Sequence, residues 1–314
     1  MRSSLIRLII AALITLALGL YALGQETNDP VKVEIWKRFV ENRATHQDRS
    51  YQAARDYLQK YGDDKDKYTE YLQKWVMYYE LDLKRKLPLL IKQKQFDEAF
   101  RVGAQILAFD PNYLRAKIDL GYAGYLAASN NNETHNVEAL YLSRSAIEQL
   151  ENGETPTEWL PFKGQDDTLA HLYFAIGFLT LKTNQEESID SLIKATQYES
   201  DIQKDSSTYY LLAEAYESGP YETMSTAYRV AYAGKEETAE SKAALEAINV
   251  WIDRIIDAYA RAIALAGTDP KIKQEREDSL NAMATYYKFR HNGSDLGMTE
   301  FIASVLTTPL PSKP

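Results

Sequence analysis

Residues 96–109, FDEAFRVGAQILAF, carry the clearest structural signal in the sequence. Apolar residues of this stretch fall at offsets 0, 3, 4, 7, 10 and 11 from Phe96, which places them along one stripe of an α-helix. They are Phe96, Ala99, Phe100, Gly103, Ile106 and Leu107. Asp110-Pro111 follows, and proline both disfavours helical geometry in the preceding residue and cannot continue the hydrogen bonding. The sequence therefore predicts a helix over 96–109 that buries one face.

The same helical period recurs from about Val31 onward. Further helices are predicted over residues 47–61, 65–86, 113–128, 138–151, 167–182, 185–199, 206–218, 220–233, 241–266 and 271–291. Short polar stretches such as Gly62-Asp63-Asp64 and Ser218-Gly219-Pro220 separate them and are ordinary turn and cap signals. Strand-type alternation is hard to find, and glycine and proline are sparse at 14 and 10 residues. The fold class is therefore predicted to be all-α.

Composition excludes several classes of function. The chain has 314 residues, of which 45% are hydrophobic, so it is long enough for two domains or one elongated repeat array. It contains no cysteine, which excludes disulfides, thiolate metal sites and cysteine-linked lipid anchors. The net charge of −9 argues against nucleic acid and anionic membrane surfaces as main partners.

Residues 1–24 have the features of a secretory signal peptide. Arg2 and Arg7 precede the apolar run 8–18, and the small residues Ala22 and Gly24 match a cleavage site after Gly24. The alternative is an uncleaved membrane anchor, because residues 5–23 are almost long enough to span a bilayer. Cleavage would release a chain that begins at Gln25 and is soluble in the periplasm or outside the cell. The anchored alternative would face the periplasm from the inner membrane.

A resemblance to a known family rests on small residues inside predicted helices. Leu120-Gly121 lies within 113–128, where a glycine costs about 1 kcal/mol relative to alanine and close helix packing is the usual reason for it. With Tyr113 on the same helix, and with Ala139 and Ala146 on the next, this pattern resembles a tetratricopeptide repeat. Partial copies are Ile176-Gly177 with Ala195, Leu212-Ala213 with Tyr216, Phe96-Asp97-Glu98-Ala99 before Asp110-Pro111, and Tyr259 with Ala262.

The resemblance implies an α-solenoid, a right-handed superhelix of antiparallel helix pairs, over residues 83–306. A helical segment over 25–82 precedes the array, and a proline-rich tail over 307–314 follows it. The period is uneven, since the Leu-Gly, Ile-Gly and Leu-Ala pairs lie 56 and 36 residues apart and the family period is about 34. Part of the excess is the stretch 152–164. Its Trp159 and Phe162 predict an ordered loop across a helix pair.

Residue types that catalyse reactions or bind metals form no recognisable motif. The histidines His46, His135, His171 and His291 lie at least 36 residues apart, and no metal, nucleophile or phosphate-loop signature occurs. His171 is predicted to pack beside apolar residues. Asp63, Asp64 and Asp66 are predicted to cap the helix that begins near Lys65 rather than to bind calcium. We therefore expect no catalytic residue, metal or cofactor.

Tyrosine is the informative excess, with 23 residues. One cluster contains Tyr57, Tyr61, Tyr68, Tyr71, Trp75 and Tyr78, and another contains Tyr209, Tyr210, Tyr216, Tyr221, Tyr228 and Tyr232. Such residues serve either as spacers between helices or as contact residues in a concave groove. In the family that the chain resembles, the first helix of each pair lines the groove. Exposed residues off the packing positions are therefore the candidate partner-binding set, namely Lys117, Tyr125, Tyr173, Tyr210 and Glu214.

Three classes of function remain open. The first is a non-catalytic exported scaffold that binds a peptide or protein partner on a concave helical surface. The second is an envelope protein that binds a glycan or another solute through tyrosine and tryptophan faces. The third is an enzyme whose site is assembled from distant residues, but no motif in the sequence supports this class. The first is preferred, with no nucleic-acid partner, and with membrane contact only if residues 1–24 stay attached.

Overall fold

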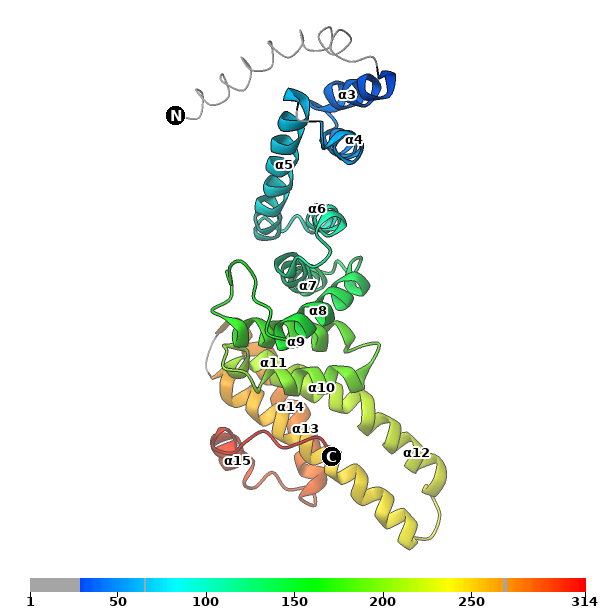
Figure 1. The fold of residues 1–314 in the computed structure, drawn as a ribbon. Helices are drawn as coiled ribbons and strands as arrows, with labels where there is room; N and C mark the ends of the chain where they lie inside the picture. Colours follow the sequence, from blue (N-terminus) through cyan, green and yellow to red (C-terminus); the bar gives the residue numbers. More distant parts are fainter. Residues whose placement is uncertain (1–28, 65, 268–269) are drawn as a thin grey trace. The chain divides into compact units, whose positions relative to one another are not determined.

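The computed structural model describes residues 29–64, 66–267 and 270–314. All regular elements within these residues are helical, as expected (Figure 1). They form two compact units, and the chain passes from the first unit to the second between Lys86 and Leu87. The sequence predicted this boundary between residues 82 and 83. Across the described residues, every helix is too short or too polar to cross a membrane. The predicted signal peptide lies outside the described residues.

The first unit consists of α3 (Pro30–Asn42), α4 (Gln47–Tyr61) and most of α5 (Lys67–Lys92). Its core is aromatic, because Trp36, Phe39 and Tyr57 are buried, and Trp36 and Phe39 contact rings on α5. The packing interpretation of the first tyrosine cluster is confirmed for Tyr57, Tyr61 and Tyr68, which are buried. It is wrong for Tyr78, which is 65% exposed. Helix α3 lies inside the helical segment predicted over 25–82, but it was not among the individually predicted helices.

A buried lysine links the first turn of α3 to the segment between α4 and α5. Lys32 is 7% exposed, and its ammonium lies 2.6 Å from Asp64 and 2.7 Å from Asp66. Asp66 also accepts hydrogen bonds from the backbone N–H groups of Tyr68 and Thr69, at 2.9 and 2.8 Å. The predicted capping role is therefore confirmed for Asp66, and the aspartate additionally pairs with Lys32.

Substitution of Asp66 by alanine should destabilise the first unit by about 1–2 kcal/mol, since it removes the helix cap and one partner of a buried cation. Burial works against ionisation of Asp66, but the Lys32 and Thr69 hydrogen bonds outweigh it and lower its pKa. The folded state therefore binds fewer protons than the unfolded state, and this stability is lost as pH falls below about 4. Urea unfolding at pH 7 and pH 3 should show a smaller difference between variant and parent at pH 3. The exposed Asp63→Ala is the matched control and should behave like the parent.

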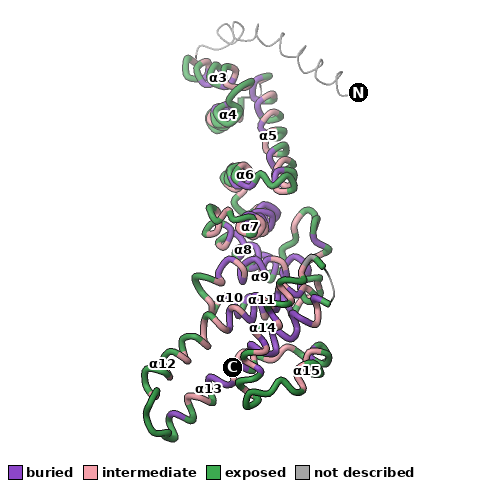
Figure 2. Tube along the Cα trace, turned by 180° about the vertical axis from the view of Figure 1, so that it is seen from behind, coloured by how far each residue is buried: buried purple, intermediate pink, exposed green. Residues whose placement is uncertain are grey.

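The second unit begins with helices that pack on their neighbours in pairs. Helices α6 (Phe96–Phe109), α7 (Leu114–Ala128), α8 (Asn136–Glu151), α9 (Gln165–Thr180) and α10 (Gln185–Ala195) follow one another, with α7 packed on α8, α9 on α10, and α7 on α9. The predicted bounds of α6 are confirmed, and of its apolar stripe only Leu107 stays partly exposed. Figure 2 shows how much of α7 and α9 is buried. These helices form the centre of the unit.

Close helix approach at the predicted glycines is confirmed. A Cβ atom on Gly121 would lie 2.5 Å from Ser143 Oγ and 3.1 Å from Ser143 Cα of α8. Gly124 faces Ala139 of the same helix, so position 121 opposes 143 while 124 opposes 139, which shows that α7 and α8 are antiparallel. On α9, a Cβ on Gly177 would lie 2.6 Å from Leu192 Cγ of α10.

The ordered loop predicted over 152–164 is also confirmed. Phe162 is buried, and its ring meets those of Tyr122 and His171 at 5.3 and 5.2 Å. Buried Arg115 holds the loop by donating to the carbonyl oxygen of Glu158 at 2.9 Å, while it pairs with buried Asp119 at 2.8 Å. His171 packs here between aromatic rings, as predicted.

The last helices depart from the predicted pattern. The remaining elements are η1 (Ile202–Lys204), α11 (Ser206–Tyr216), η2 (Glu217–Tyr221), α12 (Glu222–Tyr232), α13 (Ala239–Ala266), η3 (Pro270–Ile272), α14 (Lys273–Arg290), α15 (Met298–Ser304) and η4 (Val305–Thr307). The turn predicted at Ser218-Gly219-Pro220 is wrong, because η2 is a π-helical turn that joins α11 to α12. Pro220 lies within this turn, whose i→i+5 hydrogen bonds differ from the α-helical pattern that proline disrupts, and the chain continues as a helix beyond it.

Because α11 runs on into α12, the antiparallel partner of α11 is α13 and not α12. Helix α12 and the first part of α13 run side by side away from the rest of the unit, joined at their far end by residues 233–238 (Figure 1). No residue of α12 is buried. We call this pair of helices the arm.

Candidate functional site

A carboxylate at the base of the arm receives hydrogen bonds from two tyrosines on two other helices. Glu217 accepts at 3.0 Å from the hydroxyl of Tyr259 on α13 and at 2.6 Å from that of Tyr286 on α14. One turn earlier, Glu214 accepts from the hydroxyl of Tyr210 at 2.8 Å. The ring of Tyr210 lies 6.2 Å from that of Tyr259, so both carboxylates belong to one cluster. We call these five residues the Tyr–Glu site.

The π turn places Glu217 in this cluster. Glu217 is its first residue, and the extra residue in the turn changes the direction of side chains relative to an uninterrupted α-helix. Tyr221, the last residue of the turn, packs edge-on against Tyr286 at 5.3 Å. Single π turns inside α-helices occur frequently at functional sites, so the turn marks this cluster independently of its hydrogen bonds.

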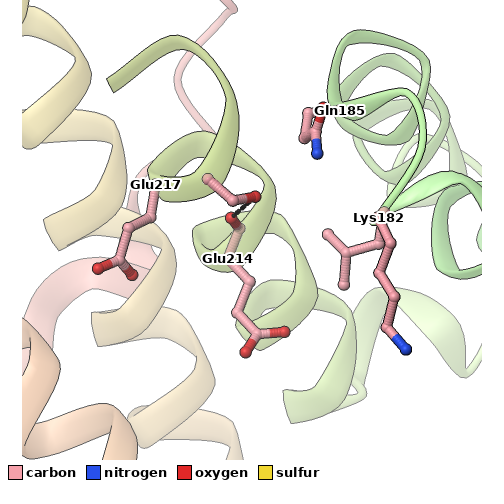
Figure 3. A pocket seen from close by; sticks show the side chains of 6 residues that line it. Lys182, Gln185, Glu214 and Glu217 are labelled. Atoms are coloured by element: carbon pink, nitrogen blue, oxygen red, sulfur yellow. Dashed lines mark hydrogen bonds between the residues drawn. The ribbon is translucent and has the colours of Figure 1, made fainter. Parts of the chain in front are cut away.

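A pocket of about 430 Å³ opens beside the site. It is lined by Leu181, Lys182, Gln185, Glu214, Glu217 and Ser218. Figure 3 shows Glu214 and Glu217 on the α11 side and Lys182 and Gln185 on the opposite side, at the turn between α9 and α10. Gly219 makes this approach possible, because a Cβ there would lie 2.7 Å from Gln185 Cβ.

The site is acidic and its phenols stay protonated. Burial raises the pKa of Tyr210, Tyr259 and Tyr286, and each neighbouring carboxylate raises it further. Burial also raises the pKa of Glu275 on α14, with added repulsion from Asp205 and Glu214. Among the ion pairs of the described residues, none involves Glu214, Glu217 or Glu275. The pocket therefore presents the two carboxylates as hydrogen-bond acceptors, with Lys182 as the cationic side chain of its lining.

The structure brings together only two of the five sequence-predicted residues. Tyr210 and Glu214 form the hydrogen-bonded pair described above. Tyr125 packs edge-on against Phe174 and Phe178, so it fills the space between α7 and α9. The expectation that Lys117 is exposed is wrong, since it is 8% exposed and donates to Ser145 Oγ at 3.0 Å. Its hydrocarbon stem is buried with α7, and only the amine reaches a polar partner.

Tyr173 lies in a different pocket, of about 310 Å³, so the predicted set does not line one groove. Its hydroxyl donates to Glu151 at 2.9 Å, and its ring stacks on Tyr198 with centroids 5.9 Å apart. Ile147 and Ile176 add apolar surface to this second pocket, and Arg144 pairs with Glu187 at its edge.

Sequence reasoning missed Glu217 and Tyr286. Glu217 stood next to Ser218-Gly219-Pro220, which was interpreted as a break, and Tyr286 lies 69 residues further along the chain. Tyr259 was noticed only as a repeat residue. The sequence did contain a signal for the other part of the site. Tyr210 and Glu214 are four residues apart, and side chains at this spacing lie next to each other on a helix.

The described residues contain no group of three or more histidine, aspartate or glutamate side chains placed to hold a metal ion. Comparison with known proteins finds no matching family model, no matching curated protein and no matching solved structure. Chemically, the Tyr–Glu site can bind hydrogen-bond donors and cations through its carboxylates and offer tyrosine edges to apolar groups.

Proposed function

We propose that this chain is a non-catalytic scaffold that binds a peptide segment of a protein partner at the Tyr–Glu site. The observation that carries the proposal is the half-exposed pair Glu214 and Glu217, which has no cationic partner among the described residues and lines an open pocket. A segment that inserts a lysine or arginine would supply the missing charge, and charged hydrogen bonds of this kind are strong. Tyr210 and Tyr286 are partly exposed and add rigid contact area at small entropic cost.

The proposal extends to architecture and location. We propose that the paired helices stack as a right-handed superhelix like that of tetratricopeptide repeats, which the antiparallel packing of α7 on α8 supports. We also propose export directed by residues 1–24, to the periplasm or outside the cell. Nucleic acid is not a proposed partner, since the net charge is −9.

Selection from a random peptide library tests the binding site. Peptides selected on the chain should contain lysine or arginine, and the Glu214→Gln/Glu217→Gln variant should weaken their binding at least tenfold. Raising salt from 50 to 500 mM should weaken the binding of the parent because the attraction is ionic. Sequencing of the selected peptides gives their composition, and fluorescence anisotropy with one labelled selected peptide measures the effects of the variant and of salt.

Tyr173→Phe is the matched control, because it removes a hydroxyl that bonds a glutamate in the other pocket. Peptides should bind this variant as they bind the parent. Selected peptides without basic residues, or with equal affinity for the double glutamine variant, would contradict the proposal.

A glycan-binding function has one observation in its favour, the stacked rings of Tyr173 and Tyr198 beside Glu151. Stacked aromatic rings beside a carboxylate suit a sugar ring with its hydroxyl groups. If a glycan array gives binding that Tyr173→Ala abolishes while peptide selection fails, the glycan function replaces the peptide function.

A further inference from the structure

Residues 308–314, with the sequence Thr-Pro-Leu-Pro-Ser-Lys-Pro, follow η4 without helix or strand, and their first residue, Thr308, is extended. Three prolines restrict their own φ angles, and each pushes the residue before it towards extended geometry. Ser312 is the only residue of the segment free of both restrictions. Such a segment loses little conformational entropy when it binds, which is why proline-rich segments are common ligands.

Two arginines of α13 bind the backbone of this segment. Arg261 donates to the carbonyl oxygens of Thr308 and Pro309 at 3.0 and 2.9 Å, and Arg254 donates to that of Ser312 at 2.8 Å. The arginines are seven residues apart, about 10.5 Å along a helix. Pro309 and Ser312 are three residues apart, about 9.3 Å along an extended proline-rich segment. The two spacings match, so α13 recognises an extended backbone.

Side chains on either side of this backbone add selectivity. Leu310 packs against the hydrophobic core of the second unit. The ammonium of Lys313 lies 2.8 Å from Asp190 and 3.5 Å from Glu186, both on α10. The surface formed by α10 and α13 therefore favours a segment with a leucine and, three residues later, a lysine.

The receptor side of this contact is built into the fold, while the bound segment is not. Arg261 is also held by Asp257 at 2.6 Å, one turn earlier on α13, and this contact does not involve residues 308–314. Within the segment, Thr308, Pro309, Ser312 and Pro314 are exposed and the other residues are only half-buried. Segments with so little buried surface open at small cost in free energy.

We propose that the surface formed by Arg254, Arg261, Asp190 and Glu186 is a binding site for extended, proline-rich peptides that carry a leucine and a lysine at this spacing. Residues 308–314 occupy it as a built-in competitor, and a peptide of the same chemistry from a partner displaces them. This site is separate from the Tyr–Glu site, and the proposal does not depend on the function proposed there.

The test uses a fluorescein-labelled peptide, Thr-Pro-Leu-Pro-Ser-Lys-Pro, as probe. A variant that lacks residues 308–314 should bind it saturably with one site, and the full chain should bind it at least tenfold more weakly because its own segment competes. Within the shortened variant, Arg254→Gln should weaken probe binding at least fivefold. The matched control is Arg229→Gln on the exposed α12, which should leave probe binding unchanged.

A shortened variant that keeps its circular dichroism spectrum but fails to bind the probe would overturn the proposal. Equal affinity of the full and shortened chains would place the probe elsewhere and would also overturn it. If the shortened variant does not fold, full-length Lys313→Glu decides, because it repels Asp190 and Glu186 without removing any residue. That variant should bind the probe more tightly than the parent, and unchanged binding would refute the competition.

Discussion

Replacement of Arg115 by methionine should lower the free energy of unfolding by about 3–5 kcal/mol at pH 7. The change leaves Asp119 as a buried charge without its partner, and uncompensated buried charges are among the most destabilising defects in proteins. It also removes the donor that holds the carbonyl of Glu158, so the loop 152–164 should become accessible to protease. Urea unfolding and limited proteolysis measure the two effects.

The pH dependence of this loss of stability shows whether the unpaired charge of Asp119 causes it. Burial raises the pKa of Asp119 to about 6, although Arg115 opposes the rise. In the parent, the folded state therefore binds more protons than the unfolded state between about pH 4 and pH 6, and stability falls as pH rises through that window. Without Arg115 the pKa rises further. The deficit of the variant should thus be smallest near pH 4 and largest at neutral pH.

The double variant Arg115→Met/Asp119→Leu is the control for this explanation. It removes both charges, so it should be more stable than the single variant at pH 7, as expected when a buried ion pair is replaced as a unit. A single variant with the same deficit at pH 4 and pH 7 would show that the unpaired charge is not responsible.

Leucine at Gly121 should destabilise the second unit by about 1–3 kcal/mol, because there is no room for a side chain between α7 and α8. The nearest atoms include the backbone of Ser143, which cannot rotate away. Gly177→Leu should have a smaller effect, since its nearest neighbour is the flexible side chain of Leu192. Thermal unfolding followed by circular dichroism gives the order of the two effects.

Gly164→Leu is the control for both variants. Gly164 has φ 164°, an extended value that any residue adopts, and a Cβ there would meet nothing within 4 Å. It should unfold at the temperature of the parent. A Gly121→Leu variant that did the same would contradict the close approach of α7 and α8.

Sequence patterns predicted those elements whose limits are set locally. The bounds of α4 and α6 are confirmed, because the turn residues that follow them, Gly62-Asp63-Asp64 and Asp110-Pro111, act within a few residues. The break between α11 and α12 was wrong because Gly-Pro normally ends a helix, and π turns are too rare to be expected. Lys117 was misplaced because α7 is buried on most sides, so polarity alone did not identify its exposed face.

The site was predictable only in part, for a related reason. Tyr210 and Glu214 are neighbours on one helical turn, and such pairs can be read from the sequence. The contacts of Glu217 with Tyr259 and Tyr286 span 42 and 69 residues and depend on how α13 and α14 pack. Packing partners at that separation leave no local pattern.

The arm gives the second unit a mechanical property. Helix α13 has 28 residues, about 42 Å of continuous helix, and its partner α12 continues the π turn that carries Glu217. One helix leaves the Tyr–Glu site and the other returns to it at Tyr259. The hydrogen bond between Glu217 and Tyr259 therefore joins the two sides of the arm at its base. We expect a displacement of the tip near Gly234 to change the geometry of this hydrogen bond.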